Sequence, residues 1–141
     1  MGGDTVGPVQ RVDGDLLVSA TDLTRFLACR HLTRLDLEVA RGERPAPVEA
    51  DDGLEVLRRR GLAHEAAYVA ALRGRGLRVV EITAADRIHG REALRAAEEV
   101  TVAAMADGAD VVYQATLVDG AWRGHADLLL RAADGTEVPL P

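Results

Sequence analysis

The sequence contains no lysine, so all 17 of its basic residues are arginine. Its single cysteine, Cys29, excludes an internal disulfide. No apolar run approaches the roughly 20 residues that a membrane-spanning helix needs. Only Phe26, Tyr68, Tyr113 and Trp122 are aromatic. The hydrophobic core must therefore be built from leucine, valine and alanine.

The composition is that of a folded domain, since 48% of the 141 residues are apolar and 28% are charged. A chain of this length supports one compact domain. Its formal net charge of -6 argues against binding nucleic acid through bulk positive charge, although it allows a locally basic groove. Residues 1–4 have neither a basic nor an apolar leader character, so we expect a cytoplasmic protein.

The pattern of apolar residues predicts an α+β fold with helices first and strands later. Residues 1–18 form an N-terminal arm, and residues 19–141 form the domain, which starts with an S-x-x-D capping box at 19–22. The expected elements are helices at 20–40, 52–73 and 91–106, a strand at 78–82, and strands at 111–118 and 121–131. A hairpin turn is expected at Asp119-Gly120, and a third strand could begin within 136–140.

The second helix carries an ionisable pair on its apolar side. At 100° per residue one arc of about 100° contains Leu54, Leu57, Gly61, His64, Glu65, Tyr68 and Leu72. We expect Leu57, Tyr68 and Leu72 to be buried against the sheet, so that Leu57→Ala costs about 2–5 kcal/mol. His64 is then either a hydrogen-bonded core histidine or, with Glu65, part of a site for a metal or a basic partner.

The last strand carries a second candidate group. Strict alternation predicts one face made of Arg123, His125, Asp127 and Leu129, and an opposite face with Trp122, Ala126, Leu128 and Leu130. The polar face is either solvated or presents Asp127 as an acidic ligand. Cys29 is either a small buried hydrophobic residue or one ligand of an iron–sulfur site. The arginines at 58–60 and at 73, 75 and 78 are either solvated or contact phosphate.

Three segments, in order, resemble the N-terminal part of a RecB-like nuclease of the PD-(D/E)XK superfamily. The first, residues 19–37, is similar to the opening helix S-A-S-D-L…F-L-x-C-R-H-L…L-D-L. The second, residues 60–65, resembles the R-G-x-x-H-E helix that carries the family's metal-binding histidine. The third, residues 113–115 with 122–127, resembles Y-Q-A…W-R-G-x-A-D, in which the aspartate is the first acidic ligand. The agreement extends from about residue 16 to residue 131.

The resemblance implies helices packed on the antiparallel hairpin of an incomplete restriction-endonuclease-like sheet. It also implies DNA as the substrate and a Mg²⁺ or Mn²⁺ ion held by His64 and Asp127, which would be the catalytic residues within about 4–6 Å of each other. Other roles follow in the same way: supporting contacts from Glu65, Gln114 and His125, phosphate contacts from Arg58, Arg60 and Arg73, and an iron–sulfur ligand in Cys29.

The family's last catalytic motif, (D/E)-x-K, has no counterpart here. Its nearest match is Glu137-Val138-Pro139, with proline in place of lysine, and the further cysteines of an iron–sulfur cluster are also absent from the sequence. We therefore expect a chain truncated before that motif and inactive alone, which would need a missing C-terminal segment or a partner helicase. The alternatives are a non-catalytic nucleic-acid-binding or adaptor module of the same fold, and an unrelated α+β domain with His64 and Asp127 far apart.

Overall fold

The computed structural model describes residues 9–47, 52–83 and 90–132, and in this part of the chain the fold is α+β, as predicted. Its helices are α1 (Ala20–Ala28), α2 (Arg30–Ala40), α3 (Asp52–Gly74) and α4 (Arg91–Ala106). Its strands are β1 (Gln10–Val12), β2 (Asp15–Leu17), β3 (Val79–Glu81), β4 (Val111–Asp119) and β5 (Trp122–Leu130). The strand expected within 136–140 lies outside the described residues.

The main sheet has the order β3-β4-β5, with β3 parallel and β5 antiparallel to β4. The predicted hairpin and edge strand are thus confirmed. The hairpin loop, however, is Gly120-Ala121 rather than Asp119-Gly120, because Asp119 still pairs with Trp122. Gly120 has φ 58°, which suits the first position of the two-residue hairpin turn that requires glycine there.

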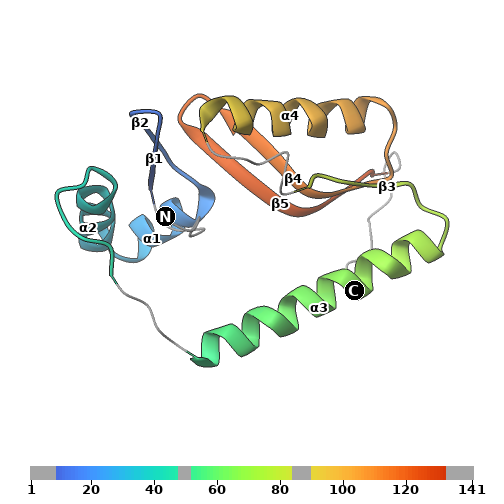
Figure 1. Cartoon of the computed structure of the whole chain (residues 1–141), viewed down its shortest axis with the longest axis horizontal. Coiled ribbons are helices and arrows are strands. Elements are labelled where there is room, and N and C mark those ends of the chain that lie inside the picture. Colours follow the sequence, from blue (N-terminus) through green and yellow to red (C-terminus); the bar gives the residue numbers. More distant parts are fainter. Residues whose placement is uncertain (1–8, 48–51, 84–89, 133–141) are drawn as a thin grey trace.

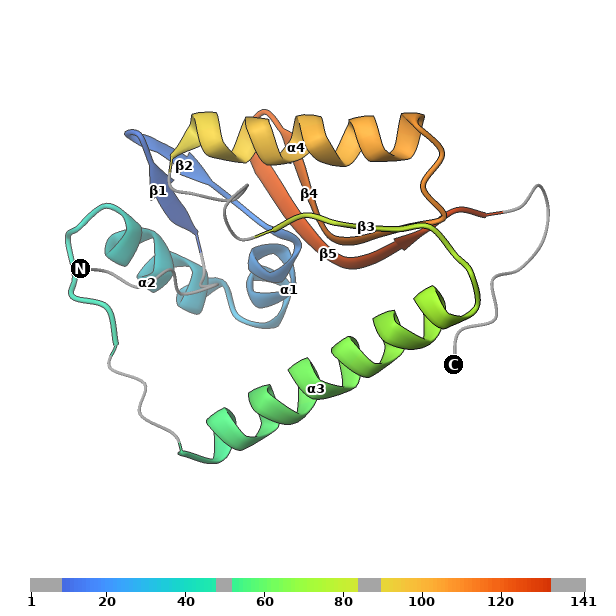
Figure 2. The ribbon, with the colours of Figure 1, turned by 45° about the vertical axis from the view of Figure 1, so that its right-hand side comes forward.

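Helices cover both faces of this sheet (Figures 1 and 2). Helix α4 lies along one face and forms the main core with it; α3 runs past the other face. The core cluster beneath α4 consists of Ile82, Ala97, Ala104, Ala109, Val112 and Ala115, with Val80, Ala126 and Leu129 packed against it. The small alanine side chains let α4 approach the sheet closely. No aromatic side chain belongs to this cluster.

Side chains of α4 also bond the edge of β4 beyond the short strand β3. Strand pairing ends where the Ile82 N–H donates to the Tyr113 carbonyl. Further along β4, the Thr116 N–H donates to the Thr101 hydroxyl over 3.1 Å. The Val118 N–H donates to a Glu98 carboxylate oxygen over 2.9 Å. These backbone donors of the edge are therefore satisfied without another strand.

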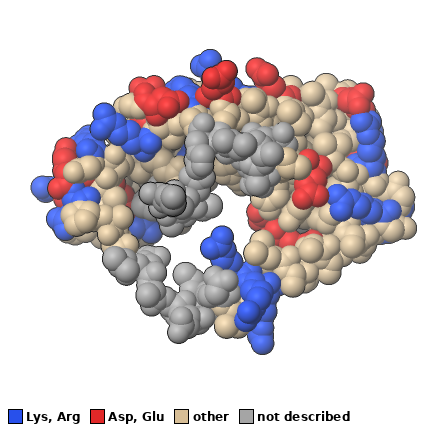
Figure 3. All heavy atoms as spheres, in the orientation of Figure 1, with Lys and Arg blue, Asp and Glu red and all other residues tan. Residues whose placement is uncertain are grey.

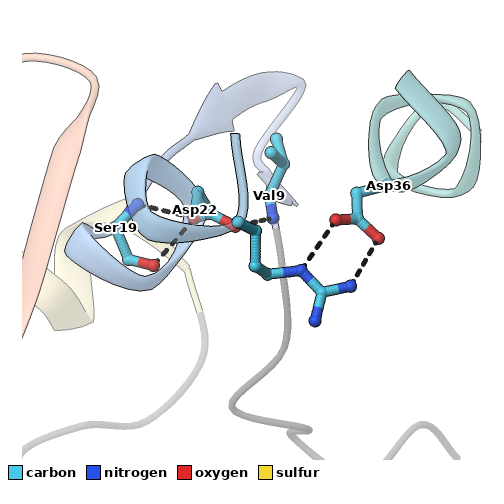
Figure 4. A network of polar contacts seen from close by, with 5 residues as sticks. Val9, Ser19, Asp22 and Asp36 are labelled. Atoms are coloured by element: carbon cyan, nitrogen blue, oxygen red, sulfur yellow. Dashed lines mark hydrogen bonds and ion pairs between the residues drawn. The ribbon is translucent and has the colours of Figure 1, made fainter. Parts of the chain in front are cut away.

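The helix predicted over 20–40 is wrong in one respect, since it is two helices that meet at Cys29. Cys29 is extended, with φ −158° and ψ 102°, and it is exposed. The break brings the Arg25 guanidinium to the Asp36 carboxylate through two hydrogen bonds of 3.0 and 3.1 Å (Figure 4). An unbroken helix would hold these two residues about 16 Å apart along its axis. The ion pair between α1 and α2 thus exists only because the helix breaks.

The face predicted for α3 is correct only toward its C-terminus. Leu72 is 2% exposed and Tyr68 is half-buried, but Leu57 is 66% exposed, so its expected burial is wrong. The reason is geometric: the C-terminal half of α3 lies against the sheet, whereas its N-terminal half extends past the sheet (Figures 1 and 2). A regular apolar pattern predicts which side of a helix is apolar. It does not predict over what part of its length that side packs against another element.

Residues 9–18, the described part of the predicted N-terminal arm, form a β-hairpin that contacts both strand β5 and helix α4. Strands β1 and β2 pair antiparallel, and Val18 continues as a parallel bridge to Trp122 of β5. At the hairpin turn, the Asp13 carboxylate accepts a hydrogen bond of 2.7 Å from the Arg91 N–H in the first turn of α4. An acidic side chain at a helix N-terminus satisfies a free backbone donor and complements the helix dipole.

Over the part of the chain that the structure describes, every helix falls short of the length or apolar content that crossing a bilayer requires.

Candidate functional site

Helix α3 presents Glu65 to the sheet. One Glu65 carboxylate oxygen accepts a hydrogen bond from the Tyr113 hydroxyl and another from the Gln114 amide, each 3.3 Å long. Glu65 is half-buried, whereas His64, one residue earlier, is exposed. The carboxylate rather than the imidazole is therefore the α3 group that the structure joins to the sheet.

Tyr113 and Gln114 are consecutive residues of β4, and yet both side chains reach the same carboxylate. In a regular strand, successive side chains point to opposite faces. Gln114 departs from this geometry with φ 59°, in the left-handed region, which costs a non-glycine residue about 1–2 kcal/mol. On the α4 face the same departure is visible, because Val112 and Ala115 both belong to the core cluster although they are three positions apart, an odd spacing that a regular strand places on opposite faces.

Strand β5 departs from alternation opposite this point. Pairing runs from Tyr113–Leu128 to Ala115–Ala126, which leaves Gln114 opposite Asp127 without a ladder pair. Ala126 and Leu129 both pack on the α4 side. The two residues between them, Asp127 and Leu128, therefore face α3, on the same side of the sheet as Glu65.

This reversal of the pleat corrects the face assignment made from the sequence. Strict alternation placed Asp127 with Leu129 and separated Leu129 from Ala126; the structure instead places Ala126 and Leu129 together in the core. The result favours a site, since Asp127 shares the α3 face with Glu65, Tyr113 and Gln114. In the described part of the chain, no three histidine, cysteine, aspartate or glutamate side chains gather closely enough to hold a metal ion.

The pKa of the Tyr113 phenol is raised above its usual value, firstly by burial and secondly by the negative charge of Glu65. Both effects disfavour the tyrosinate. The neutral phenol therefore contributes stability that is fully present below about pH 10 and is lost as the pH rises through the folded-state pKa. At neutral pH Tyr113 is therefore a neutral phenol that donates a hydrogen bond to Glu65.

Replacing Glu65 by glutamine should lower the pKa of Tyr113 part of the way toward its usual value, because the charge is removed and the burial remains. The measurement is the ultraviolet absorbance of tyrosinate as a function of pH, with Tyr68→Phe as the background so that Tyr113 is the only tyrosine. Glu81→Gln, which removes a weaker electrostatic contribution to the same phenol, is the matched control and should shift the pKa less. An unchanged midpoint in Glu65→Gln would contradict the contact.

The other residues singled out from the sequence lie apart from this cluster or at its border. His125 is exposed on β5, with its Nδ1 atom 3.3 Å from the Thr116 hydroxyl. Arg58 and Arg60 are exposed on α3, and Arg73, also exposed, forms an ion pair of 3.2 Å with Glu81. Figure 3 shows arginine side chains of α3 at the border of an open space between this helix and the α1–α2 region.

The alternation of residues in the last strand predicts only a face for Arg123 and no further role. The residue is 8% exposed, and burial lowers the pKa of its guanidinium while the nearby Asp22 carboxylate opposes that effect. It lines a shallow pocket of about 290 Å³ at the end of the hairpin, together with Glu98, Leu117, Val118, Asp119, Trp122 and Gly124. The buried Asp22–Arg123 neighbourhood connects α1 to β5, and nothing in a local motif would have paired these two residues.

A comparison of the chain with models of protein families, with curated proteins and with solved structures finds no match.

Proposed function

We propose that this chain is the N-terminal part of a metal-dependent nuclease that hydrolyses phosphodiester bonds in DNA. One observation supports the proposal: Ala126 and Leu129 both pack on the α4 side of the sheet, so strand geometry leaves the exposed Asp127 on the side from which Glu65 contacts Tyr113 and Gln114. The three ordered motifs that resemble RecB-like nucleases support the same reading. We also propose that the sheet is part of a restriction-endonuclease-like fold.

The donor chemistry on this face suits a hard divalent cation. Carboxylate oxygens are the preferred ligands of Mg²⁺ and Mn²⁺, and water fills the remaining positions of such ions. Glu65 and Asp127 would hold the ion, and water would fill its other positions. His64, exposed beside Glu65 on α3, does not gather with these two carboxylates into a three-ligand group, so the proposal does not depend on it. An ion bound there would neutralise charge that develops on the phosphate and would lower the pKa of a water molecule.

The described residues have two separate tasks in this proposal. Tyr113 and Gln114 hold the Glu65 carboxylate through donated hydrogen bonds, so its orientation does not depend on the ion. The exposed Arg58 and Arg60 supply positive charge for phosphate oxygens. No lysine occurs in these 141 residues to orient or activate the water. We therefore expect the chain by itself to bind the ion weakly and to leave DNA uncleaved.

Manganese binding tests the proposal through the paramagnetic broadening of amide signals in NMR spectra of the whole chain. We expect Mn²⁺ to broaden the signals of residues 65 and 127 first, and the effect to weaken strongly in Asp127→Asn and Glu65→Gln. His31→Ala removes an exposed histidine from α2 and serves as the control that leaves the effect unchanged. His64→Ala shows whether the imidazole contributes.

Two results would overturn the proposal. One is broadening that spreads over exposed acidic residues and is the same in Asp127→Asn as in the natural sequence. The other is robust Mn²⁺-dependent cleavage of single-stranded DNA that survives both His64→Ala and Asp127→Ala. The second result would mean that any catalysis takes place away from this face.

The second candidate function is non-catalytic binding of nucleic acid, and the N-terminal half of α3 favours it. Arg58, Arg59 and Arg60 are exposed there, next to the exposed apolar side chains of Val56, Leu57 and Leu62. Arginine contacts phosphate, and aliphatic side chains such as leucine can insert between base steps.

A salt series separates this function from the first. Binding of single-stranded DNA without divalent ions should weaken as salt increases, and replacing Arg58, Arg59 and Arg60 by glutamine should reduce both the affinity and the salt dependence. Replacing Arg34 and Arg44, which pair with Glu38 on α2, by glutamine is the control for loss of charge elsewhere. Binding that ignores salt and the α3 arginines would dismiss this candidate.

A further inference from the structure

We propose that Gln114 is a positioning residue, whose left-handed backbone turns Asp127 toward α3 and whose amide fixes Glu65 on the same face. This inference rests on the proposed function for its purpose, since it explains how the two carboxylates come to share a face. It goes beyond that function by assigning the arrangement to one residue that contributes no carboxylate itself.

The backbone hydrogen bonds show that the reversal occurs at Gln114. Before it, the Arg131 N–H donates to the Asp110 carbonyl, so this pair is hydrogen-bonded across β4 and β5. Regular alternation from there would turn the Thr116 N–H toward β5 as well. Instead the Thr116 N–H donates to Thr101 of α4, on the other side of β4. The alternation has therefore changed phase between Asp110 and Thr116, and Gln114 is the residue of that segment with positive φ.

Strand β5 changes phase with it. Beyond the break, the Arg123 N–H donates to the Val18 carbonyl, away from β4, whereas alternation from Arg131 would point it toward β4. Register stays constant on both sides, so no residue is inserted. The whole effect is a local rotation of the two strands at the Gln114–Asp127 position. That rotation puts Asp127 and Leu128 on one face in succession.

That this position is glutamine rather than glycine indicates that both its backbone conformation and its side-chain amide are used. Glycine adopts a positive φ without steric cost, so backbone geometry alone would be served better by glycine. Glutamine instead supplies an amide that donates to Glu65 over 3.3 Å. The conformational cost of the side chain is accepted where that side chain makes a contact that glycine cannot make.

Two substitutions separate the backbone from the amide. Gln114→Gly keeps the backbone conformation and removes the amide; Gln114→Val opposes the left-handed conformation because its side chain is β-branched. Leu117→Val places the same side chain at an exposed position of the same strand and is the control. The conformational readout is the pair of close Hα–Hα contacts, Tyr113–Leu128 and Thr116–His125, in nuclear Overhauser spectra. An uninterrupted ladder cannot give both, because close pairs then recur every two residues.

We expect both contacts in the natural sequence, in Leu117→Val and in Gln114→Gly. In Gln114→Gly the Mn²⁺ concentration that broadens residues 65 and 127 should rise about threefold to tenfold, the effect of one lost hydrogen bond. Gln114→Val should lose one of the two contacts and, with it, the broadening at residue 127. If that variant does not fold, Gln114→Gly decides alone.

The inference is wrong if Gln114→Val keeps both contacts and the Mn²⁺ response of Leu117→Val. It is also wrong if Gln114→Gly loses a contact, since glycine tolerates this backbone, or if it abolishes broadening at residue 127, since Gln114 would then be a ligand. Failure of the proposed function has a different signature. Mn²⁺ would then leave residues 65 and 127 unbroadened in the natural sequence, while the Hα–Hα contacts would still follow the substitutions.

Discussion

Leu72→Ala should lower the free energy of unfolding by about 2–5 kcal/mol, the usual cost of removing most of a large side chain from a core. Leu72 is 2% exposed near the C-terminal end of α3, where the helix lies against the sheet. The same change at Leu57, which is 66% exposed, should alter the free energy by less than about 0.5 kcal/mol. Leu57→Ala is thus a matched control on the same helix.

Urea unfolding of the two variants measures the difference directly, provided that the slope with denaturant stays constant. Equal losses in the two variants would mean that the N-terminal half of α3 packs against the rest of the chain in solution. The apolar pattern of the sequence predicts equal losses, because Leu57 and Leu72 lie on the same side of the helix. The contrast between them therefore decides between apolar pattern and observed packing.

Asp22→Asn should lower the free energy of unfolding by about 2–3 kcal/mol, because it weakens the hydrogen bonds to a buried carboxylate and removes a negative charge near the buried Arg123. Asp22 is 6% exposed, and its carboxylate accepts hydrogen bonds from the N–H and the hydroxyl of Ser19, each 2.7 Å long. It also accepts one of 2.8 Å from the Val9 N–H (Figure 4). Burial lowers the pKa of the Arg123 guanidinium on β5, and the nearby charge of Asp22 partly opposes that shift. Asparagine keeps the shape and loses the charge.

Asp15→Asn is the control for this substitution, since Asp15 forms an exposed ion pair of 3.2 Å with Arg91. Such surface pairs contribute about 0–1 kcal/mol. A double-mutant cycle with Arg123→Met then measures the coupling between Asp22 and Arg123, and the double variant should recover part of the loss. A loss in Asp22→Asn no larger than in Asp15→Asn would show that the carboxylate is not required to compensate Arg123.

Local patterns in the sequence predicted those parts of the fold that depend on local chemistry. The capping box predicted at 19–22 is present, with Asp22 bonded back to Ser19. The α4 helix and the β4–β5 hairpin follow from apolar periodicity and from a glycine turn. The break at Cys29 does not, because the Arg25–Asp36 ion pair that accompanies it joins residues eleven positions apart and forms only once α2 folds back on α1.

The candidate site shows the same division. Its members Glu65, Gln114 and Asp127 could be named from motifs, but the face on which Asp127 lies could not be derived by alternation. A single residue with positive φ reverses the face to which every later side chain of the strand points. Glutamine seldom adopts a positive φ, so its presence does not predict that conformation. The sequence of β4 contains a weak indication of the reversal. It begins Val-Val-Tyr-Gln-Ala-Thr, and strict alternation cannot put both the apolar Val112 and the apolar Ala115 on one face, with the polar-tipped Tyr113 and Gln114 on the other.

The bonds from α4 to the edge of β4 also bear on how this chain behaves in a crowded solution. A strand edge with free backbone donors is a template on which a strand of another molecule can pair, and such pairing leads to aggregation. Here Thr101 and Glu98 occupy the donors of Thr116 and Val118, at the very stretch where β3 is too short to cover the edge. A foreign strand would have to break these contacts before it could bind. The helix that builds the core thereby also protects the sheet against polymerisation from this side.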